Sequence, residues 1–581
     1  MRSGHHRDRG RVAKRRQRRV APSIVITAVA LLGIGLVGTG YTYVVKSRCD
    51  GMTALTMLAA PEQATILSTL AERWQETDPS VNGNCIRLEV TSKDSAQVVA
   101  AMSPAWDARR DGPRPDIWAP ESSTWVTLAR GRPDTRNLLP PVSPPLARTP
   151  IVVAMPKPMA AAVGWPNQQL GWIDLFKRLK DDPRGWAASG YPEWGQVRLG
   201  IADPARDTAA LSALSALVNY DGDSELSDTE LVGALKFERA VTVFTPTTAH
   251  LLQGLGKADA AGTSLNYLSA FPATERDVSQ YNATNPRVPL AAVYPPEGAP
   301  GADHPFVVLR APWVDPVRKK AAAQLLEFLN GPKGVPEYIK EGFRPPDGEA
   351  TDRITESRGL LVAGGAEKAS QDASILLGVV GTWTALRRPG NALNVIDTSE
   401  SMANQVPGTD QTRLEIAEKA TAGVLDLLKP DSTLTLWSFA TERRELVPLG
   451  PAGKRRAEVE KQLRELEPAG GSALYDTTLA AYERALSNWQ PNRLNIVILL
   501  TDGGDEEDLG LSRQQLVNEL TRIRDPKKPI QFIAIAYGPS ADVTSLRAIT
   551  KAVGGRTYVS KNPADLTSVL LAAVVGVNAA P

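Results

Sequence analysis

Short apolar runs alternate with amphipathic segments along most of the chain beyond residue 50, and this pattern predicts strands that alternate with helices. In the first half we expect strands at residues 53–60, 86–91, 115–120 and 151–154, with helices at 63–76 and 95–102. Later we expect helices at 317–330, 414–428 and 474–487, and strands at 434–439, 494–501 and 530–536. Alternating strands and helices build mostly parallel sheets, so the fold class is α/β.

The apolar run at residues 375–386, which includes Trp383, is too short for a membrane span. A helix buried against one domain, or between two domains, accounts for it better. The final apolar run, residues 566–577, is interpreted as the last helix of the C-terminal domain.

Residues 23–45 form an uncharged run of 23 residues rich in Ile, Val, Leu and Gly, which is long enough to span a hydrocarbon core of roughly 30 Å. Residues 1–22 before it are a basic tail, and two Tyr, a Lys and an Arg at its far end are typical interfacial anchors. The positive-inside rule places the tail in the cytoplasm and the rest outside. We expect an uncleaved signal anchor in the cell membrane, crossing once with the C-terminal domains extracellular; a cleaved signal, whose apolar core is about 7–15 residues, is the alternative.

The 581 residues are too many for one domain. Residues 1–20 carry nine Arg or Lys and one Asp, a local charge of +8, so the remainder of a chain with net charge +2 carries −6. Because the basic residues are confined to one tail, the charge pattern does not favour nucleic acid as a partner.

Cys49 and Cys85 are the two cysteines, and both follow the expected membrane segment. An even number of cysteines outside the cell suggests a disulfide, which would be worth about 3 kcal/mol here; two buried free thiols are the alternative. Two cysteines and four histidines leave few residues for a zinc or thiol-based active site.

Hydroxyl and carboxylate side chains follow two predicted strands near the C-terminus. Asp397, Ser399 and Ser401 come at alternate positions after one apolar run, and Asp502 follows another. Between them, a Gly-rich turn delivers Ser472 before a helix. Oxygen ligands without nearby His or Cys favour a hard ion such as Mg²⁺ over zinc, although helix capping and turn formation would also explain these residue types.

These three segments together resemble the von Willebrand factor A domain and its metal-ion-dependent adhesion site, from about residue 393 to the C-terminus. The resemblance implies a doubly wound, Rossmann-like domain that binds Mg²⁺, with Mn²⁺ or Ca²⁺ as substitutes. It implies that Ser399 and Ser401 bind the ion directly, that Asp397 and Asp502 act mainly through water, and that Ser472 stands where the family usually has Thr. Glu400 stands where the family usually has Gly. A protein partner would complete the coordination with an Asp or Glu carboxylate.

The region from about residue 49 to 347 resembles the type 2 solute-binding proteins, which are two-lobed periplasmic-binding-protein-like receptors. Its signals are the opening strand and helix, Tyr294-Pro295, and Gly342-Phe343-Arg344 near its end. Trp118 and Trp125 are expected in the core or packed between the lobes rather than as a platform for a sugar. By position, the residues expected to face the solute are Glu62, Ser92, Ser122, Ser123, Asp207, Thr208 and Tyr294. Asp207 disfavours an anionic ligand, while Asp207 and Thr208 would equally serve as helix caps.

The expected organisation is a basic tail (1–22), a transmembrane signal anchor (23–45), a solute-binding-protein-like domain (49–347), a linker with a connecting helix (348–390) and an A domain (391–581). This arrangement predicts a membrane-anchored extracellular binding protein of the cell envelope. Its A domain would make metal-dependent protein contacts, and its two-lobed module would sense a small-molecule solute. The alternative is the substrate-binding component of an ABC-type importer.

An enzyme is not expected. The sequence has no Gly-x-Ser-x-Gly, Walker A or His-Glu-x-x-His motif, and His250 and His304 have no evident Ser or Cys partner. A Mg²⁺-dependent hydrolytic site is the remaining enzymatic alternative.

Overall fold

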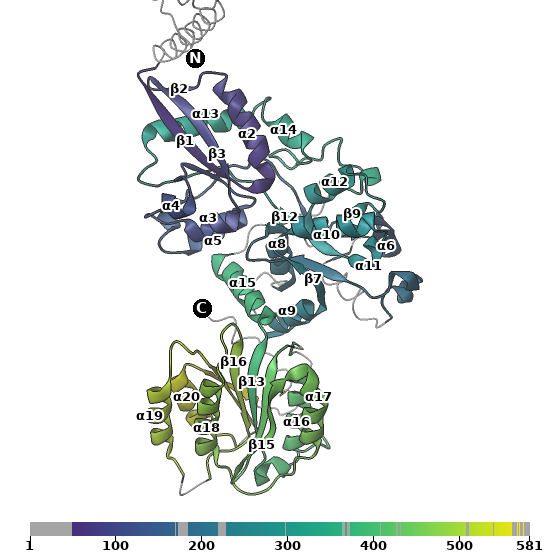
Figure 1. Cartoon of the computed structure of the whole chain (residues 1–581), viewed down its shortest axis with the longest axis vertical. Helices are drawn as coiled ribbons and strands as arrows, with labels where there is room; N and C mark the ends of the chain where they lie inside the picture. Colours follow the sequence, from purple (N-terminus) through teal and green to yellow (C-terminus); the bar gives the residue numbers. More distant parts are fainter. Residues whose placement is uncertain are drawn as a thin grey trace, which may run out of the picture.

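The computed structural model describes residues 49–560 apart from residues 169, 172–183, 219–227, 297, 363–366, 369–371, 407, 426–427, 430, 507–509 and 539, and beyond them residues 566, 569 and 573. The basic tail (1–22), the expected membrane segment (23–45) and most of the final apolar run therefore lie outside the described residues. Within the described residues, no helix has the length and apolar character that a membrane span needs. Two lobes and a C-terminal unit follow one another along the molecule (Figure 1).

The first lobe is built on a five-stranded sheet in the order β11-β4-β1-β3-β2. Its centre is parallel, since β1 (Gly51–Ala59) pairs in that sense with β3 (Asn84–Ser92) and β4 (Ile117–Ala119). Both edges are antiparallel: β11 (Val307–Val308) and β2 (Ser80–Val81). Its helices are α2 (Pro61–Gln75), α3 (Ser95–Ala101), α4 (Ala108–Asp111), α5 (Ser123–Gly131), α13 (Pro316–Leu329) and α14 (Val335–Lys340).

Helix α2 shows how the pattern produces the packing. Pro61 is the first residue of the helix, where a backbone N–H has no partner within the helix, so the N–H that proline lacks costs no hydrogen bond. Ile66, Leu67, Leu70 and Trp74 recur at helical spacing and are buried against the sheet. The expectation that Trp118 and Trp125 pack in the core or between the lobes is likewise confirmed, because both rings are buried.

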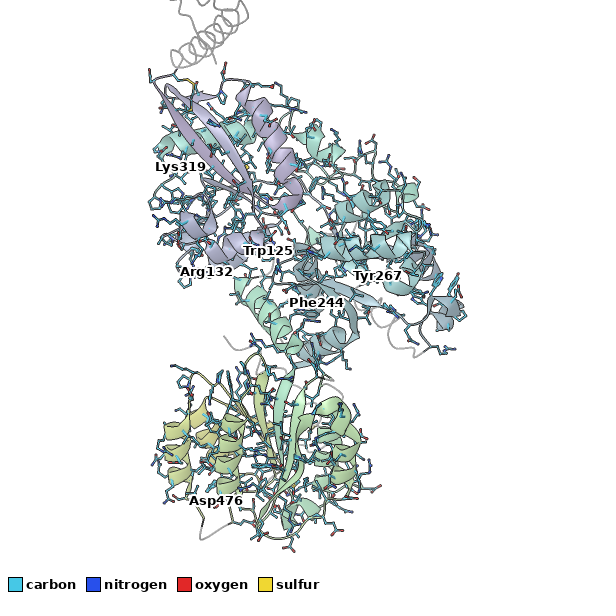
Figure 2. The ribbon with its side chains drawn as sticks, viewed as in Figure 1. Trp125, Arg132, Phe244, Tyr267, Lys319 and Asp476 are labelled. Atoms are coloured by element: carbon cyan, nitrogen blue, oxygen red, sulfur yellow. A yellow bond between two sulfur atoms is a disulfide. The ribbon has the colours of Figure 1, made fainter. Side chains whose placement is uncertain are left out.

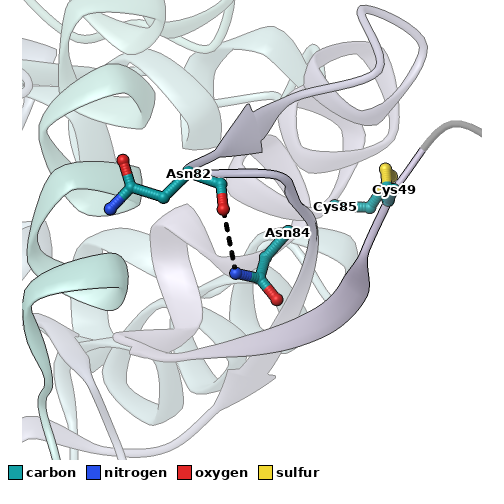
Figure 3. The surroundings of a disulfide bond; sticks show 4 residues. All are labelled: Cys49, Asn82, Asn84 and Cys85. Carbon is teal, nitrogen blue, oxygen red and sulfur yellow. Dashed lines mark hydrogen bonds between the residues drawn. A yellow bond between two sulfur atoms is a disulfide. The ribbon is translucent and has the colours of Figure 1, made fainter.

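The disulfide between Cys49 and Cys85 is confirmed, and its two cysteines are 36 residues apart in the sequence (Figure 3). The parallel register pairs Met52 with Cys85, which brings the chain just before β1 beside the start of β3. The turn between β2 and β3 places Asn82 and Gly83 at positive φ, and Asn84 Nδ2 donates to the carbonyl of Asn82 over 3.4 Å.

The second lobe holds a three-stranded sheet in the order β8-β5-β9 and a two-stranded sheet of β6 and β7. β5 (Ile151–Pro156) is antiparallel to both β8 (Phe271–Thr274) and β9 (Leu290–Val293), whereas β6 (Leu199–Ala202) and β7 (Val241–Thr245) are parallel. The antiparallel sheet differs from the expectation of mostly parallel pairing. Apolar runs indicate where strands lie, but strand direction depends on how the chain crosses between the lobes.

The helices and short elements around these sheets are α6 (Lys157–Ala162), α8 (Thr208–Val218), α9 (Asp228–Ala240), α10 (Thr248–Ala260), α11 (Ser264–Tyr267), α12 (Glu275–Ala283), η1 (Arg136–Leu138), η2 (Gly185–Ser189), η3 (Pro192–Trp194), η4 (Glu356–Arg358), β10 (Ala299–Pro300) and β12 (Glu367–Lys368).

Helix α15 (Ala373–Arg387) connects all three bodies, as Figure 1 shows. Leu376 packs into the first-lobe cluster that contains Trp125, while Val379 and Trp383 pack into the core of the second lobe. The apolar run at 375–386 is therefore a helix buried between domains, as expected. Beyond the helix, only Arg388 and Pro389 precede the first strand of the C-terminal unit.

A buried carboxylate joins the second lobe to the C-terminal unit. The carboxylate of Glu238, in α9, forms two ion pairs. Its Oε1 atom lies 3.1 Å from Arg387 Nη1 and 3.1 Å from Nζ of Lys429, which belongs to the C-terminal unit. Arg239 also contacts this carboxylate. The junction is therefore a packed ionic contact and not a bare linker.

The C-terminal unit is a six-stranded sheet in the order β15-β14-β13-β16-β17-β18, parallel except for the edge strand β15. Alternate residues of the central strand face opposite layers: Ile396 packs toward α16 and α17, and Val395 toward α18, α19 and α20. This is the doubly wound arrangement that the sequence predicts.

The strands of this unit are β13 (Gly390–Asp397), β14 (Thr433–Phe439), β15 (Arg443–Pro451), β16 (Leu494–Thr501), β17 (Gln531–Tyr537) and β18 (Arg556–Ser560). Its helices are α16 (Arg413–Leu425), α17 (Ala452–Arg464), α18 (Leu474–Ser487), α19 (Arg513–Ile523), α20 (Val543–Val553) and the short η5 (Glu400–Ala403).

Candidate metal centre and solute site

Two carboxylates lie at the ends of neighbouring parallel strands. β13 ends at Asp397, β16 ends at Thr501, and the two strands are paired along their length. Asp397 and Asp502 therefore meet at one edge of the sheet, the carboxyl edge where doubly wound folds place their sites. Both are fully buried.

Hydrogen bonds join these carboxylates to the two serines that follow β13. The Ser399 backbone N–H donates to Asp397 Oδ1 over 2.9 Å, and the Ser401 hydroxyl donates to Asp502 Oδ1 over 2.8 Å. The Ser399 and Ser401 hydroxyl oxygens are 3.2 Å apart. The structure thus brings together four of the five residues predicted to bind the ion.

Ser472, the fifth, lies in the Gly-rich turn before α18. That turn is bound to the loop after β13, since Ala469 N donates to Thr398 O and Glu400 N donates to Gly470 O, each over 2.9 Å. It is also bound to the loop after β16, since Glu506 N donates to Ser472 O over 2.9 Å. The Ser472 hydroxyl is buried and has no hydrogen-bond partner among the residues that the structure describes.

The residues fit a hard divalent ion. Two carboxylates and three hydroxyls supply only oxygen, and the unpartnered Ser472 hydroxyl is the kind of buried polar atom that a ligand satisfies. In the part of the chain that the structure describes, no group of three or more Asp, Glu, His or Cys side chains is arranged to hold a metal ion. Burial raises the pKa of Asp397 to about 6, and the neighbouring charge of Asp502 adds to that rise.

Between the two lobes, Glu62 is the predicted solute residue with an unsatisfied group. It lies in the first turn of α2, and its buried Oε1 atom has no hydrogen-bond partner in the described part of the chain. His304 Nδ1 is 3.5 Å from that oxygen. Burial raises the pKa of Glu62 to about 7, whereas burial and the nearby Arg276 lower the pKa of His304 to about 3, so the imidazole is neutral at physiological pH.

Thr208 bridges the lobes instead of pointing at an open space. Its hydroxyl accepts from Trp125 Nε1 of the first lobe over 2.7 Å and donates to the carboxylate of Glu121. Trp125 lies at the boundary between the lobes in Figure 2. Burial and the adjacent Glu62 raise the pKa of Glu121.

The other residues predicted to face a solute are bound within the protein, except Ser92. Ser122 caps α5, and Ser123 donates to Asp303 over 2.5 Å. Asp207 accepts from the backbone N–H groups of Ala210 and Thr248, which is the helix-capping alternative raised by the sequence. Tyr294 is buried and donates to Glu275 over 2.5 Å, while Ser92 is exposed at the end of β3.

Comparison with known proteins identifies both halves of the chain. Residues 55–344 match the bacterial extracellular solute-binding proteins, and residues 393–504 match the von Willebrand factor type A domain. The chain joins a bacterial solute-binding domain to a von Willebrand factor A domain. Both families are binding modules.

Individual relatives are distant. An uncharacterized protein found in two strains of Mycobacterium tuberculosis is 24% identical over 533 residues, which is 88% of this chain and 75% of the relative. A solved von Willebrand factor type A structure from Catenulispora acidiphila is 21% identical with a TM-score of 0.28 and covers 33% of this chain and 43% of its own. A periplasmic thiamin binding protein is 12% identical with a TM-score of 0.34, covering 55% of this chain and 86% of its own. This chain thus spans less than half of the Catenulispora structure.

Two residues of the A-domain site were missed by the sequence analysis. The Thr501 hydroxyl donates to Asp397 Oδ2 over 2.6 Å, and Arg413 Nη1 lies 2.5 Å from Asp502 Oδ2. For Arg413 a signal exists: a cation in the first turn of a helix opposes the helix dipole, so such a residue needs another reason to be there. Thr501 gives no such signal, because a Thr at the end of a strand is ordinary.

The raised pKa of Glu62 predicts a pH dependence for the solute-binding domain. Between pH 4.5 and about 7 the folded state holds a proton that the unfolded chain has released, so stability falls as pH rises through this window. Glu62→Gln should flatten the fall, which we expect to be on the order of a few degrees in melting temperature. Melting curves at several pH values test this, with the exposed Glu72→Gln on the same helix as control. If the melting temperature of Glu62→Gln fell with pH as steeply as that of the parent, the pH dependence would belong to other groups.

Proposed function

We propose that this chain is a membrane-anchored, extracellular binding protein whose A domain contacts a protein partner through a bound Mg²⁺ ion. The observation that carries the proposal is the hydrogen-bonded cluster of Asp397, Ser399, Ser401 and Asp502 beside the unpartnered hydroxyl of Ser472. In this role Ser399, Ser401 and Ser472 would contact the ion, and the carboxylates would hold it through water. When bound, the ion supplies a Lewis-acidic position that accepts an Asp or Glu carboxylate of the partner.

The position of the cluster supports this role. β13 runs from α15 to Asp397, so the ion-binding edge lies at the end of the A domain that faces away from the two lobes (Figure 2, where Asp476 marks that end). A partner could therefore reach this edge without contacting the solute-binding domain. Glu400 is exposed beside it and would favour a partner with basic residues around its carboxylate.

The solute-binding domain would bind a small molecule between its lobes. Helix α15 contacts both lobes and continues into β13, so a change in the angle between the lobes would reach the A domain directly. The N-terminal segment, residues 23–45, would hold the protein in the cell membrane with both domains outside.

Titration of the full-length protein with Mg²⁺ and with Mn²⁺ tests the metal site. We expect saturable binding by the parent and none by the double variant Ser399→Ala, Ser401→Ala, because removal of both hydroxyls leaves too few direct ligands. These replacements keep the charges of Asp397 and Asp502. Ser432→Ala is the matched control, since this buried serine of the same domain accepts from Gly390 N at the opposite end of β13.

Equal binding by the parent and the double variant would place the ion elsewhere. Absence of binding by the parent would reduce the A domain to a structural module.

A further inference from the structure

Asp502 already has a cation beside it. Arg413 Nη1 lies 2.5 Å from Asp502 Oδ2, while the Ser401 hydroxyl occupies Oδ1. The side chains of Asp502 and Arg413 are 0% and 11% exposed. Each oxygen of the Asp502 carboxylate therefore has a partner within the protein. Its negative charge is balanced by Arg413 in a site that is largely shielded from bulk water.

The surroundings hold the guanidinium in this place. The backbone N–H of Arg413 donates to Asn404 O over 3.0 Å, which fixes the start of α16 against the loop after β13. Gly538 lies beside the guanidinium: a Cβ atom at that residue would be 3.4 Å from Arg413 Cζ. Tyr537, just before it, is fully buried and its hydroxyl reaches Met402 Sδ at 2.7 Å. Arg413 is thus contacted by two further segments, the loop after β13 and the end of β17.

The pairing of Arg413 with Asp502 affects the stability of the site when no ion is bound. Two buried carboxylates with no cation would repel each other, and an uncompensated buried charge is strongly destabilising. The Arg413 charge removes that penalty for Asp502. The same charge opposes the entry of a divalent cation into the cluster, because like charges a few Å apart repel appreciably in a poorly solvated site.

We propose that Arg413 is a resident counter-cation of Asp502, which keeps the site assembled in the ion-free protein and lowers its affinity for divalent ions. The second half of this inference rests on the proposed metal-binding function; the first half does not. A weakly held ion gains most from an added negative ligand, so the ion and a carboxylate-bearing partner would bind cooperatively.

The first test is a double-mutant cycle on the full-length protein in excess chelator. Arg413→Met keeps most of the side-chain volume and removes the charge, and we expect it to lower the melting temperature of the A domain by about 8 °C. Asp502→Asn in the Arg413→Met background should recover much of that loss, because it removes the uncompensated charge. Additive losses from the two replacements would overturn the counter-cation role. Arg484→Met is the control, since it removes a guanidinium from the exposed pair with Glu445 in the same domain.

The second test is titration of the same variants with Mg²⁺ alone. Arg413→Met should bind Mg²⁺ about tenfold or more tightly than the parent, and Mg²⁺ should restore its melting temperature. Arg413→Lys, which keeps the charge, should bind like the parent. Equal or weaker binding by Arg413→Met would overturn the effect on affinity. If no variant bound Mg²⁺ while the cycle showed coupling, the metal function would fail and the counter-cation role would stand.

Discussion

Glu275→Gln should destabilise the second lobe by about 3–5 kcal/mol, because it leaves a buried arginine without its counter-charge. Glu275 is fully buried in the first turn of α12. It accepts from Arg344 Nε over 2.8 Å and from Arg344 Nη2 over 2.6 Å, and the Tyr294 hydroxyl donates to it as well. Glutamine preserves the shape but cannot neutralise the guanidinium. Urea unfolding of the full-length protein, followed through the solute-binding domain, measures the loss.

A matched control is available in the same domain. Glu337 pairs with Arg73 over 2.8 Å at the surface, where the two side chains are 24% and 43% exposed. Glu337→Gln should destabilise the domain far less than Glu275→Gln, since exposed ion pairs contribute little. Similar losses from the two variants would show that burial does not set the strength of the Glu275 pair. Glu275→Leu combined with Arg344→Met should recover much of the loss, because it removes both charges.

Loss of the disulfide should cost the first lobe about 3–4 kcal/mol, the conformational entropy of an unfolded loop that spans 36 residues of sequence. The double variant Cys49→Ser, Cys85→Ser removes the cross-link. The loop it closes contains β1 and α2, the central strand and a main helix of this lobe. We expect a lower urea midpoint for the first lobe and little change in the A domain.

Reductant provides the control for this variant. The parent should lose stability in reductant by a similar amount, whereas the serine variant should not respond. A parent protein whose unfolding is unaffected by complete reduction would contradict the prediction.

The A domain was largely predictable from its sequence. Its central strands are buried on both faces, so residues 496–500 form a continuous apolar run. Asp397 is the last residue of β13, and Asp502 directly follows β16. The strand at 494–501 and the helix at 474–487 have the same bounds in the sequence prediction and in the structure. Long-range pairing was not predictable: nothing near Arg413 in the sequence indicates a partner 89 residues away.

The solute-binding domain was predictable in outline and less so in its site. Seven residues were expected to face the solute because they follow strands or begin helices. Polar residues at such positions also cap helices and form contacts between lobes. In the structure Ser122 and Asp207 accept hydrogen bonds from helix N-termini, and Thr208 bonds to Trp125 of the other lobe. Position along the chain does not distinguish these roles. His304 entered the sequence analysis only as a residue without a catalytic partner, since its proximity to Glu62 depends on folding over more than two hundred residues.

The bridging helix and the disulfide together determine how this molecule would respond to a pull. If the N-terminal segment holds the protein and a partner pulls at the ion site, tension runs along β13 into α15, and from there into both lobes at once. At the other end, the Cys49–Cys85 bond carries the load past the closed loop, so β1 and α2 cannot be drawn out from their own end. Under such a load the ion pairs of Glu238 with Arg387 and Lys429, which join the second lobe to the C-terminal unit, would share the tension that passes between the two domains.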